Sequence, residues 1–183
     1  MAKVMIPLVD GFEDIEAVSV IDVLRRGGIE VVTAALGDSP EVTSAHGIVM
    51  KADASVDALA DAVFDAIILP GGPGTAGLAA SEPLVELLRR HAEERRLIAA
   101  ICAAPTVLTG LGLVPPGFHL TCYPSCVMDL DRDPANVPCV EDGDFITGQA
   151  PGSAMLFALV ILKRLAGEAV ARKVARGMVT DVL

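Results

Sequence analysis

Aromatic residues are scarce in this chain, which limits how its core can be built. Its 183 residues include no tryptophan, one tyrosine and five phenylalanines, although 52% of the sequence is hydrophobic. The core must therefore be packed mainly from Ala, Val, Leu and Ile side chains. A length of 183 residues is enough for one domain with a substantial core, so we expect a single domain over residues 1–183.

Positive charge is also in short supply. Lys and Arg number 14 against 24 Asp and Glu, which gives a formal net charge of −10. The sequence contains no basic run and no patch that mixes basic with aromatic residues, so a nucleic acid is not an expected partner. Acidity alone predicts mainly that the chain is soluble.

Long apolar runs are missing as well. None reaches the roughly 20 residues that a membrane-spanning helix needs, so no membrane association is expected. Residues 1–8 lack the length and cleavage pattern of a secretory signal and are instead typical of a first strand. We therefore expect a cytoplasmic protein whose four cysteines are reduced. Their spacing fits no standard zinc pattern, and we expect no metal or other cofactor.

What the chain does contain is an alternation of short apolar runs with amphipathic segments. The apolar runs predict strands over Lys3–Leu8, 29–36, Ala66–Leu69, Leu97–Ile101 and 119–121. Hairpins are predicted for 42–44 with 48–51 and for 139–140 with 145–147. Helices are predicted over 13–26, 56–63, 83–95 with Ser81 as its cap, 154–165 and 168–176. This order indicates an α/β sandwich with a mostly parallel sheet and helices on both faces.

The stretch around Cys102 is the most informative. Five apolar residues, Leu97–Ile101, predict a buried strand, and Pro105 suits the first turn of a helix. Cys102 would then lie at a sharp strand-to-helix turn, where the helix dipole favours a thiolate. The alternative is a buried cysteine that only packs, and this stretch alone favours neither interpretation.

Three groups of chemical interest are predicted at the carboxyl ends of parallel strands, where open sheets bind ligands. They are the acidic residues Glu13, Asp14 and Glu16, the glycine-rich turn 71–74, and Cys102. Together they could supply a proton-transfer group, an oxyanion hole and a nucleophile. Taken singly, Glu16 could merely favour a helix N-terminus, and the glycines could merely form a tight turn. Their spacing matches no dinucleotide-binding fingerprint.

The three histidines give weaker indications. His91 lies among charged residues on a predicted helix, so we expect it to be solvated. His119 is expected to pack at the start of a strand. His46 falls at a loop tip, a position that is usually on the surface.

Several short motifs resemble one known family. They are G-F-E-D-I-E-A-V at 11–18, D-V-L-R-R-G-G-I at 22–29, I-L-P-G-G at 68–72, A-A-I-C-A-A-P at 99–105 and T-G-Q-A-P-G-S-A around Gly152. In this order and spacing they resemble the ThiJ/PfpI superfamily, in particular the branch that contains the Parkinsonism-associated deglycase. The resemblance covers the whole chain and implies a flavodoxin-like three-layer sandwich and a homodimer.

The resemblance also assigns roles to residues. Cys102 matches the family nucleophile, which oxidises to a sulfinate, and Glu16 matches the carboxylic acid that hydrogen-bonds to it. Gly72 and Ala103 match the backbone N–H donors that face the cysteine. To donate to a thiolate, Glu16 must be protonated, and burial beside a negative sulfur would raise its pKa as required.

The same comparison predicts the pocket and shows one departure. Gly71, His46, Cys122 and Tyr123 are expected to line the pocket. The better-known members have histidine where this chain has Tyr123, and the peptidase-like branch has histidine where this chain has Ala103. Neither family histidine is present, which counts against classical Cys–His catalysis. Cys122 and Cys126 are expected to pack, although either could resolve an oxidised Cys102 as a disulfide.

By resemblance, the function is that of a cofactor-free glyoxalase or deglycase. Its partner would be a small α-oxoaldehyde or an early glycation adduct, attacked by Cys102 while Glu16 moves protons. A second hypothesis is a redox-sensing or chaperone-like stress protein, because a low-pKa thiol is also the one that peroxide oxidises. A peptidase or amidotransferase is less well supported, since it needs an imidazole base beside the cysteine.

Overall fold

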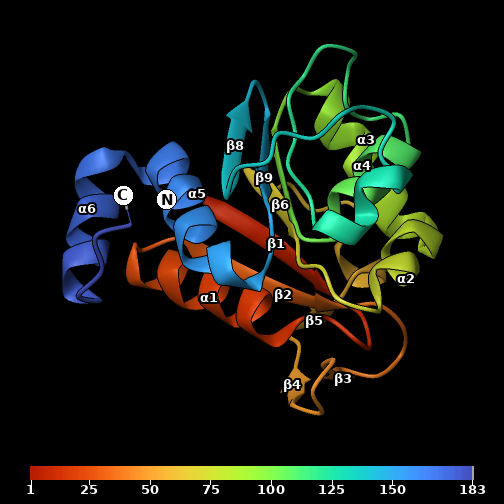
Figure 1. Cartoon of the computed structure of the whole chain (residues 1–183). Helices are drawn as coiled ribbons and strands as arrows, with labels where there is room; N and C mark the ends of the chain where they lie inside the picture. Colours follow the sequence, from red (N-terminus) through yellow and green to blue (C-terminus); the bar gives the residue numbers. More distant parts are fainter. Residues whose placement is uncertain (183) are drawn as a thin grey trace.

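The computed structural model describes residues 1–182 and has three layers, with helices on both faces of a central sheet (Figure 1). The sheet has seven strands in the order β5-β2-β1-β6-β7-β9-β8, and every neighbouring pair except β9 with β8 is parallel. Their bounds are β1 Lys3–Leu8, β2 Glu30–Ala35, β5 Ala54–Ser55, β6 Ala66–Leu69, β7 Leu97–Ile101, β8 Cys139–Asp142 and β9 Phe145–Gly148. A separate antiparallel hairpin pairs β3, Glu41–Thr43, with β4, Val49–Lys51.

Two sets of helices cover the sheet (Figure 1). One face carries α1 Asp14–Arg26 and α5 Ala154–Ala166, with α6 Glu168–Gly177 packed on α5. The other face carries α2 Thr75–Ala80, α3 Glu82–Glu93 and α4 Pro105–Gly110. Three short 3-10 helices lie in the connections, at Asp57–Leu59, Pro124–Asp129 and Pro151–Ser153. Each face therefore has its own aliphatic core, as the shortage of aromatic residues predicts.

Helix α1 shows how local sequence positions the functional end of the sheet. Val20, Val23 and Leu24 are buried against the sheet, which fits the apolar spacing of the segment. The side chain of Glu13 caps the helix by accepting the backbone N–H of Glu16 at 2.8 Å. Glu16 is thereby fixed in the first turn, at the carboxyl end of β1.

Most of the elements predicted from sequence are confirmed, including the parallel strands and both hairpins. The predicted strand 119–121 is wrong, because Thr121 donates its N–H to the Thr147 hydroxyl instead of joining a ladder. Of the helix predicted over 56–63, only the 3-10 turn Asp57–Leu59 forms. Ser81 precedes α3 as predicted, but its side chain makes no capping hydrogen bond. Sequence reasoning missed α2 and β5, which are both short.

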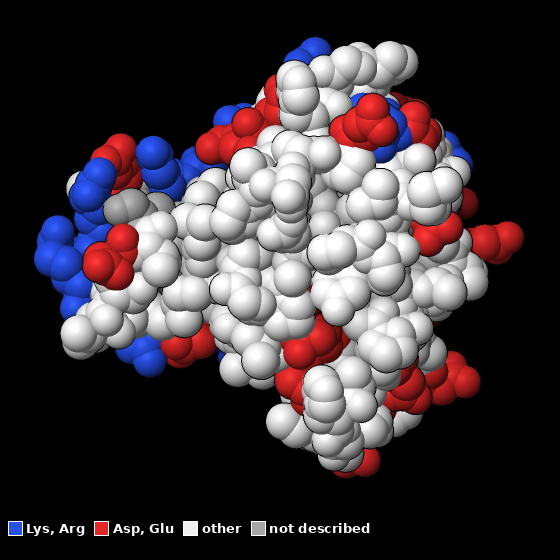
Figure 2. Space-filling model, in the orientation of Figure 1, with Lys and Arg blue, Asp and Glu red and all other residues white. Residues whose placement is uncertain are grey.

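Charged side chains are unevenly spread over the surface. In Figure 2 the Lys and Arg side chains gather at the end of the molecule formed by α6, which carries Arg172, Lys173 and Arg176. Glu168 in the first turn of that helix pairs with Arg172 and with Lys163.

Among residues 1–182, every helix is too short or too polar to cross a membrane.

Candidate active site

Cys102 lies at a strained turn between β7 and α4. Its φ angle is 65°, in the left-handed region that a residue with a side chain rarely adopts. Its N–H donates to the Gly148 carbonyl at 2.9 Å, and its carbonyl accepts the Tyr123 N–H at 2.8 Å. Pro105 then begins α4, as predicted. The two backbone bonds hold the turn in place, so the buried thiol has a fixed position.

Glu16 approaches Cys102 through a gap left by Gly71. The Gly71 N–H donates to Glu16 Oε2 at 2.8 Å. A Cβ atom at position 71 would lie 2.7 Å from the Cys102 Cβ and 2.9 Å from Glu16 Oε2. Only glycine lets the thiol and the carboxyl group come together here. The structure therefore brings Cys102, Glu16 and Gly71 to one place.

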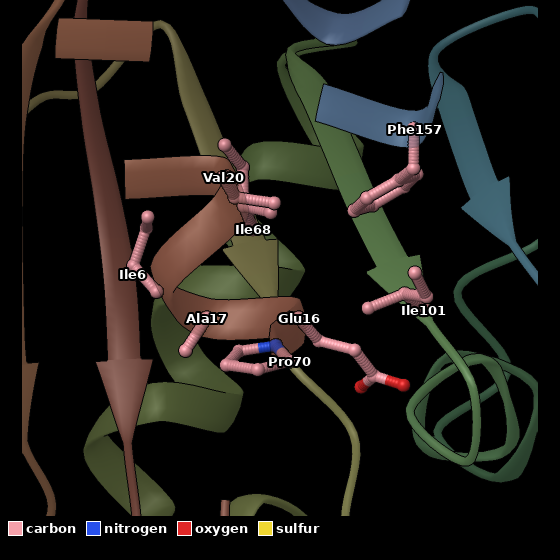
Figure 3. Close-up of a pocket in the computed structure, with 8 residues that line it drawn as sticks. All are labelled: Ile6, Glu16, Ala17, Val20, Ile68, Pro70, Ile101 and Phe157. Carbon is pink, nitrogen blue, oxygen red and sulfur yellow. The ribbon is translucent and has the colours of Figure 1, made fainter. Parts of the chain in front are cut away.

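The surroundings of Glu16 are apolar on the side of the sheet. Figure 3 shows its carboxyl group extending from α1 toward the end of the strand that carries Ile101. Ile6, Ile68 and Phe157 line the same small pocket as Glu16. The space among these side chains has no room for water, and Glu16 is fully buried. Burial raises the pKa of Glu16 to about 7, against the opposing effect of the Gly71 N–H. Glu16 Oε1 has no hydrogen-bond partner, so this oxygen is free to take a proton.

The thiol does not have the low pKa that its position at a strand-to-helix turn predicts. Burial raises the pKa of Cys102 to about 12, and the nearby charge of Glu16 adds to the increase. The backbone N–H groups of Ala103 and Gly72 lower the pKa of the thiol, but they do not outweigh burial. Burial and the Glu16 charge therefore act against the thiolate that the strand-to-helix turn predicts. The sulfur keeps its proton, and Glu16 is the group that ionises first.

The backbone N–H groups of the two predicted oxyanion-hole residues, Gly72 and Ala103, both act on the pKa of the Cys102 thiol. Gly72 has a φ angle of 105°, and a Cβ there would lie 2.4 Å from the Gly11 carbonyl oxygen and 2.6 Å from the Glu13 nitrogen. The turn can form only with glycine at this position. Ala103 follows Cys102 directly, so the strained turn positions its N–H.

His46 belongs to a hydrogen-bonded network that sequence reasoning missed. Its Nδ1 lies 2.6 Å from Asp14 Oδ2, and the Ser44 hydroxyl donates to Asp14 Oδ1. These bonds tie the β3–β4 hairpin to the start of α1. They lower the pKa of Asp14 against a raising effect of burial, and the bond with Asp14 raises the pKa of His46. A polar residue at a loop tip carries no sequence signal for such a distant partner.

The same network is the place where a cation could bind. Ligand atoms of Glu13, Asp14 and His46 lie within 4.8 Å of one another. Both Asp14 oxygens already accept hydrogen bonds, and Glu13 Oε2 caps α1. These contacts account for the cluster without a metal ion.

Tyr123 and Cys122, which were predicted to line the pocket, differ in exposure and in their relation to Cys102. Tyr123 is 42% exposed and contacts Cys102 through its backbone. Cys122 is buried and lines a separate cavity of about 260 Å³. All four cysteines are free.

Two of the histidine predictions are wrong. His91 is 2% exposed because it lies on the inner face of α3, and burial lowers its pKa to about 4. His119 is largely exposed and lies beside Asp142, because the strand that should have packed it does not form. Neither is among the groups that affect the Cys102 thiol.

A strained cysteine beside a buried glutamate at the end of a parallel strand agrees with the family that the motifs resemble. The DJ-1/PfpI family model matches residues 2–164. The chain belongs to the DJ-1/PfpI family. Within it the DJ-1 branch is supported by Drosophila melanogaster dj-1beta, which is 39% identical over 178 residues and covers 95% of both proteins.

Other DJ-1 relatives differ in length and in name. Arabidopsis thaliana DJ-1 homolog B is 38% identical over 97% of this chain, which spans only 41% of that protein. Caenorhabditis elegans DJR-1.2, named a glutathione-independent glyoxalase, is 37% identical over 91% of this chain and 89% of its own length. Oxidized Toxoplasma gondii DJ-1 superposes with a TM-score of 0.95 at 34% identity, over 98% of this chain and 99% of that one. The predicted flavodoxin-like sandwich is thus confirmed.

Proposed function

We propose that this DJ-1 family chain is a cysteine-dependent, cofactor-free glyoxalase or deglycase. Its substrates would be α-oxoaldehydes such as methylglyoxal, or their early glycation adducts. The observation that carries the proposal is the convergence of Cys102, Glu16 and the Gly72 and Ala103 N–H groups at one buried point. The name of the Caenorhabditis elegans relative supports the same class of reaction.

The raised pKa values define how the first step would proceed. As Cys102 Sγ attacks the aldehyde carbon, its proton passes to the ionised Glu16 carboxylate. Glu16 then gives this proton to the new substrate oxygen, so a neutral hemithioacetal forms and Glu16 is ionised again. The N–H groups of Gly72 and Ala103 donate to the oxygen that becomes negative during the attack. The thiol is therefore activated by substrate and Glu16 together, without a resting thiolate.

Glu16 would then move protons between the two substrate carbons. It takes the hydrogen from the hemithioacetal carbon and returns a proton to the neighbouring carbon, which converts the adduct to a hydroxy thioester. Water then cleaves the carbon–sulfur bond, releasing a hydroxy acid and restoring the thiol. Methylglyoxal and one water give lactate, so no external oxidant or reductant is consumed.

The properties of the thiol favour turnover over the redox-sensing hypothesis. Oxidation by peroxide requires thiolate character and access. Cys102 is 8% exposed and has a raised pKa, so the unliganded thiol is poorly suited to react with peroxide. A peptidase or amidotransferase is disfavoured as well, because no histidine is among the groups that affect this thiol.

We also propose that the chain forms a homodimer through the exposed face of α1 and the adjoining hairpin. Ile15 and Val18 on α1 are about half exposed, and so are Ile48 and Val49 on the segment that carries the hairpin. The bonds from Asp14 to Ser44 and His46 hold the hairpin against α1. Aliphatic side chains gathered on one face are typical of a protein interface.

Methylglyoxal consumption without glutathione tests the proposed activity. The parent should convert methylglyoxal to lactate, and Cys102→Ala should reduce the rate to background. Cys139→Ala is the matched control, because it removes a half-buried thiol on β8 and should keep the parent rate. Turnover by Cys102→Ala at the parent rate would overturn the assignment of the nucleophile, and an inactive parent would overturn the activity.

A further inference from the structure

Two cysteines outside the Cys102 site meet at one backbone atom. The Cys122 thiol donates to the Tyr123 carbonyl oxygen at 3.4 Å, and the Cys126 N–H donates to the same oxygen at 2.9 Å. Pro124 begins a 3-10 helix that turns the chain back after Tyr123. The Cys122 sulfur and the Cys126 backbone are therefore both within hydrogen-bonding reach of one atom.

The surroundings of Cys122 leave room for a small reagent. Cys122 is one wall of the cavity of about 260 Å³, which Pro124, Val127 and Gln149 also line. This volume is several times that of a water molecule, about 30 Å³. Cys126 is half-buried, so its thiol is the more accessible of the two. Burial, followed by the charge of Cys126, raises the pKa of Cys122 to about 11, which agrees with their proximity.

We propose that Cys122 and Cys126 form a second redox site, in which a hydroperoxide converts the two thiols to an intramolecular disulfide. The Cys126 sulfur attacks the O–O bond, becomes a sulfenic acid and releases water or an alcohol. The Cys122 sulfur then attacks the sulfenic sulfur and loses its proton, while the hydroxyl group leaves as water. Two electrons pass from the thiols to the peroxide, and two hydrogens leave the protein.

This site is separate from the reaction at Cys102, although one residue connects them. Tyr123 donates its N–H to the Cys102 carbonyl, while its own carbonyl accepts from the Cys122 thiol and the Cys126 N–H. The disulfide needs Cα atoms within about 7 Å, a distance that the turn at Pro124 favours. The proposal needs neither Cys102 nor Glu16, so it does not depend on the glyoxalase activity.

The test is mass spectrometry of Cys102→Ala after treatment with hydrogen peroxide and blocking of free thiols. Residues 97–132 contain no Lys or Arg before Arg132, so one tryptic peptide carries Cys122 and Cys126. We expect this peptide to lose two hydrogens, to resist the blocking reagent and to recover both thiols with dithiothreitol.

Cys102→Ala/Cys126→Ser is the matched control and should lose no hydrogens. If the peptide from Cys102→Ala only gains oxygen, or keeps two blockable thiols, the proposal is overturned. A loss of two hydrogens in the parent but not in Cys102→Ala would instead assign Cys102 as a partner and would also overturn it. Methylglyoxal turnover by reduced Cys126→Ser should equal that of the parent, which separates this result from the proposed function.

Discussion

At the scale of single residues, Cys102 and Glu16 are a buried pair of acids whose pKa values are both raised. The sequence predicts both residues and the direction of the Glu16 pKa shift. It could not predict where the proton rests, because burial of the thiol depends on strands far apart in the chain. Gly71 decides the distance between the pair, and a glycine in a glycine-rich turn carries no mark of that role.

Glu16→Gln should separate proton transfer from nucleophilicity. Gln keeps a polar side chain of the same size but cannot accept the thiol proton. Methylglyoxal turnover should fall by about two orders of magnitude or more, the usual scale for a general acid–base group. Alkylation of Cys102 should persist, because removing the Glu16 charge removes one cause of its raised pKa. Iodoacetamide labelling and turnover, measured on the same sample, check both effects.

Glu16→Asp is the control that keeps a carboxyl group but shortens the side chain that carries it. It can still ionise, but its shorter side chain lies farther from the thiol, so turnover should fall here too. Full activity in Glu16→Gln would contradict the proton-transfer role, because that variant has no carboxyl group to titrate.

At the scale of elements, the turn after β6 determines whether the site can form. Strands such as β6 and β7 were predictable, because buried runs of four or five apolar residues have few alternatives. The turn geometry was only partly predictable, since the sequence indicates glycines but not which neighbours they approach. The segment 119–121 resembles a strand locally, yet side-chain bonds from Thr121 replace its ladder.

Gly72→Ala should destabilise the protein more than Gly28→Ala. Both glycines have positive φ angles, 105° and 80°, so alanine costs about 1–2 kcal/mol of backbone strain at either position. Only at position 72 would the new Cβ also collide with backbone atoms, at 2.4 Å and 2.6 Å. Urea unfolding of the two variants gives the comparison. Equal losses of stability would show that the turn relaxes freely.

At the scale of the whole molecule, His91 and Glu16 make opposite contributions to the pH dependence of stability. The pKa of His91 is lowered to about 4, so the stability it contributes is lost as pH falls from 6.5 toward 4. The pKa of Glu16 is raised to about 7, so its contribution is lost as pH rises from 4.5 toward 7. Between about pH 4.5 and 6.5 the two slopes, each at most about 1.4 kcal/mol per pH unit, should nearly cancel.

Single substitutions should remove this compensation. In His91→Leu, the free energy of unfolding should fall as pH rises from 4.5 to 6.5, because Glu16 acts alone. In Glu16→Gln it should fall as pH decreases over the same range. Urea unfolding at several pH values checks both. If the free energy of unfolding depends on pH in the same way in the parent and in both variants, the pKa shifts of His91 and Glu16 are contradicted.

The proposed homodimer gives a second prediction at this scale. Val18→Glu places a charge on the exposed face of α1 and should shift the protein toward monomer in sedimentation equilibrium. Met128→Glu is the matched control, because Met128 is 91% exposed outside that face and should leave assembly unchanged. A monomeric parent, or the same assembly in both variants, would show that the face is not the interface.

The close approach at Gly71 has a consequence for protein engineering and for evolution. Any side chain at this position would enter the space between Cys102 and Glu16. Substitution of Gly71 therefore cannot be used to tune the reactive groups. The exposed residues His46 and Tyr123 have no such restriction. Selection for a new substrate should therefore accumulate changes on the hairpin and around Tyr123. A saturation library at position 71 should return glycine alone.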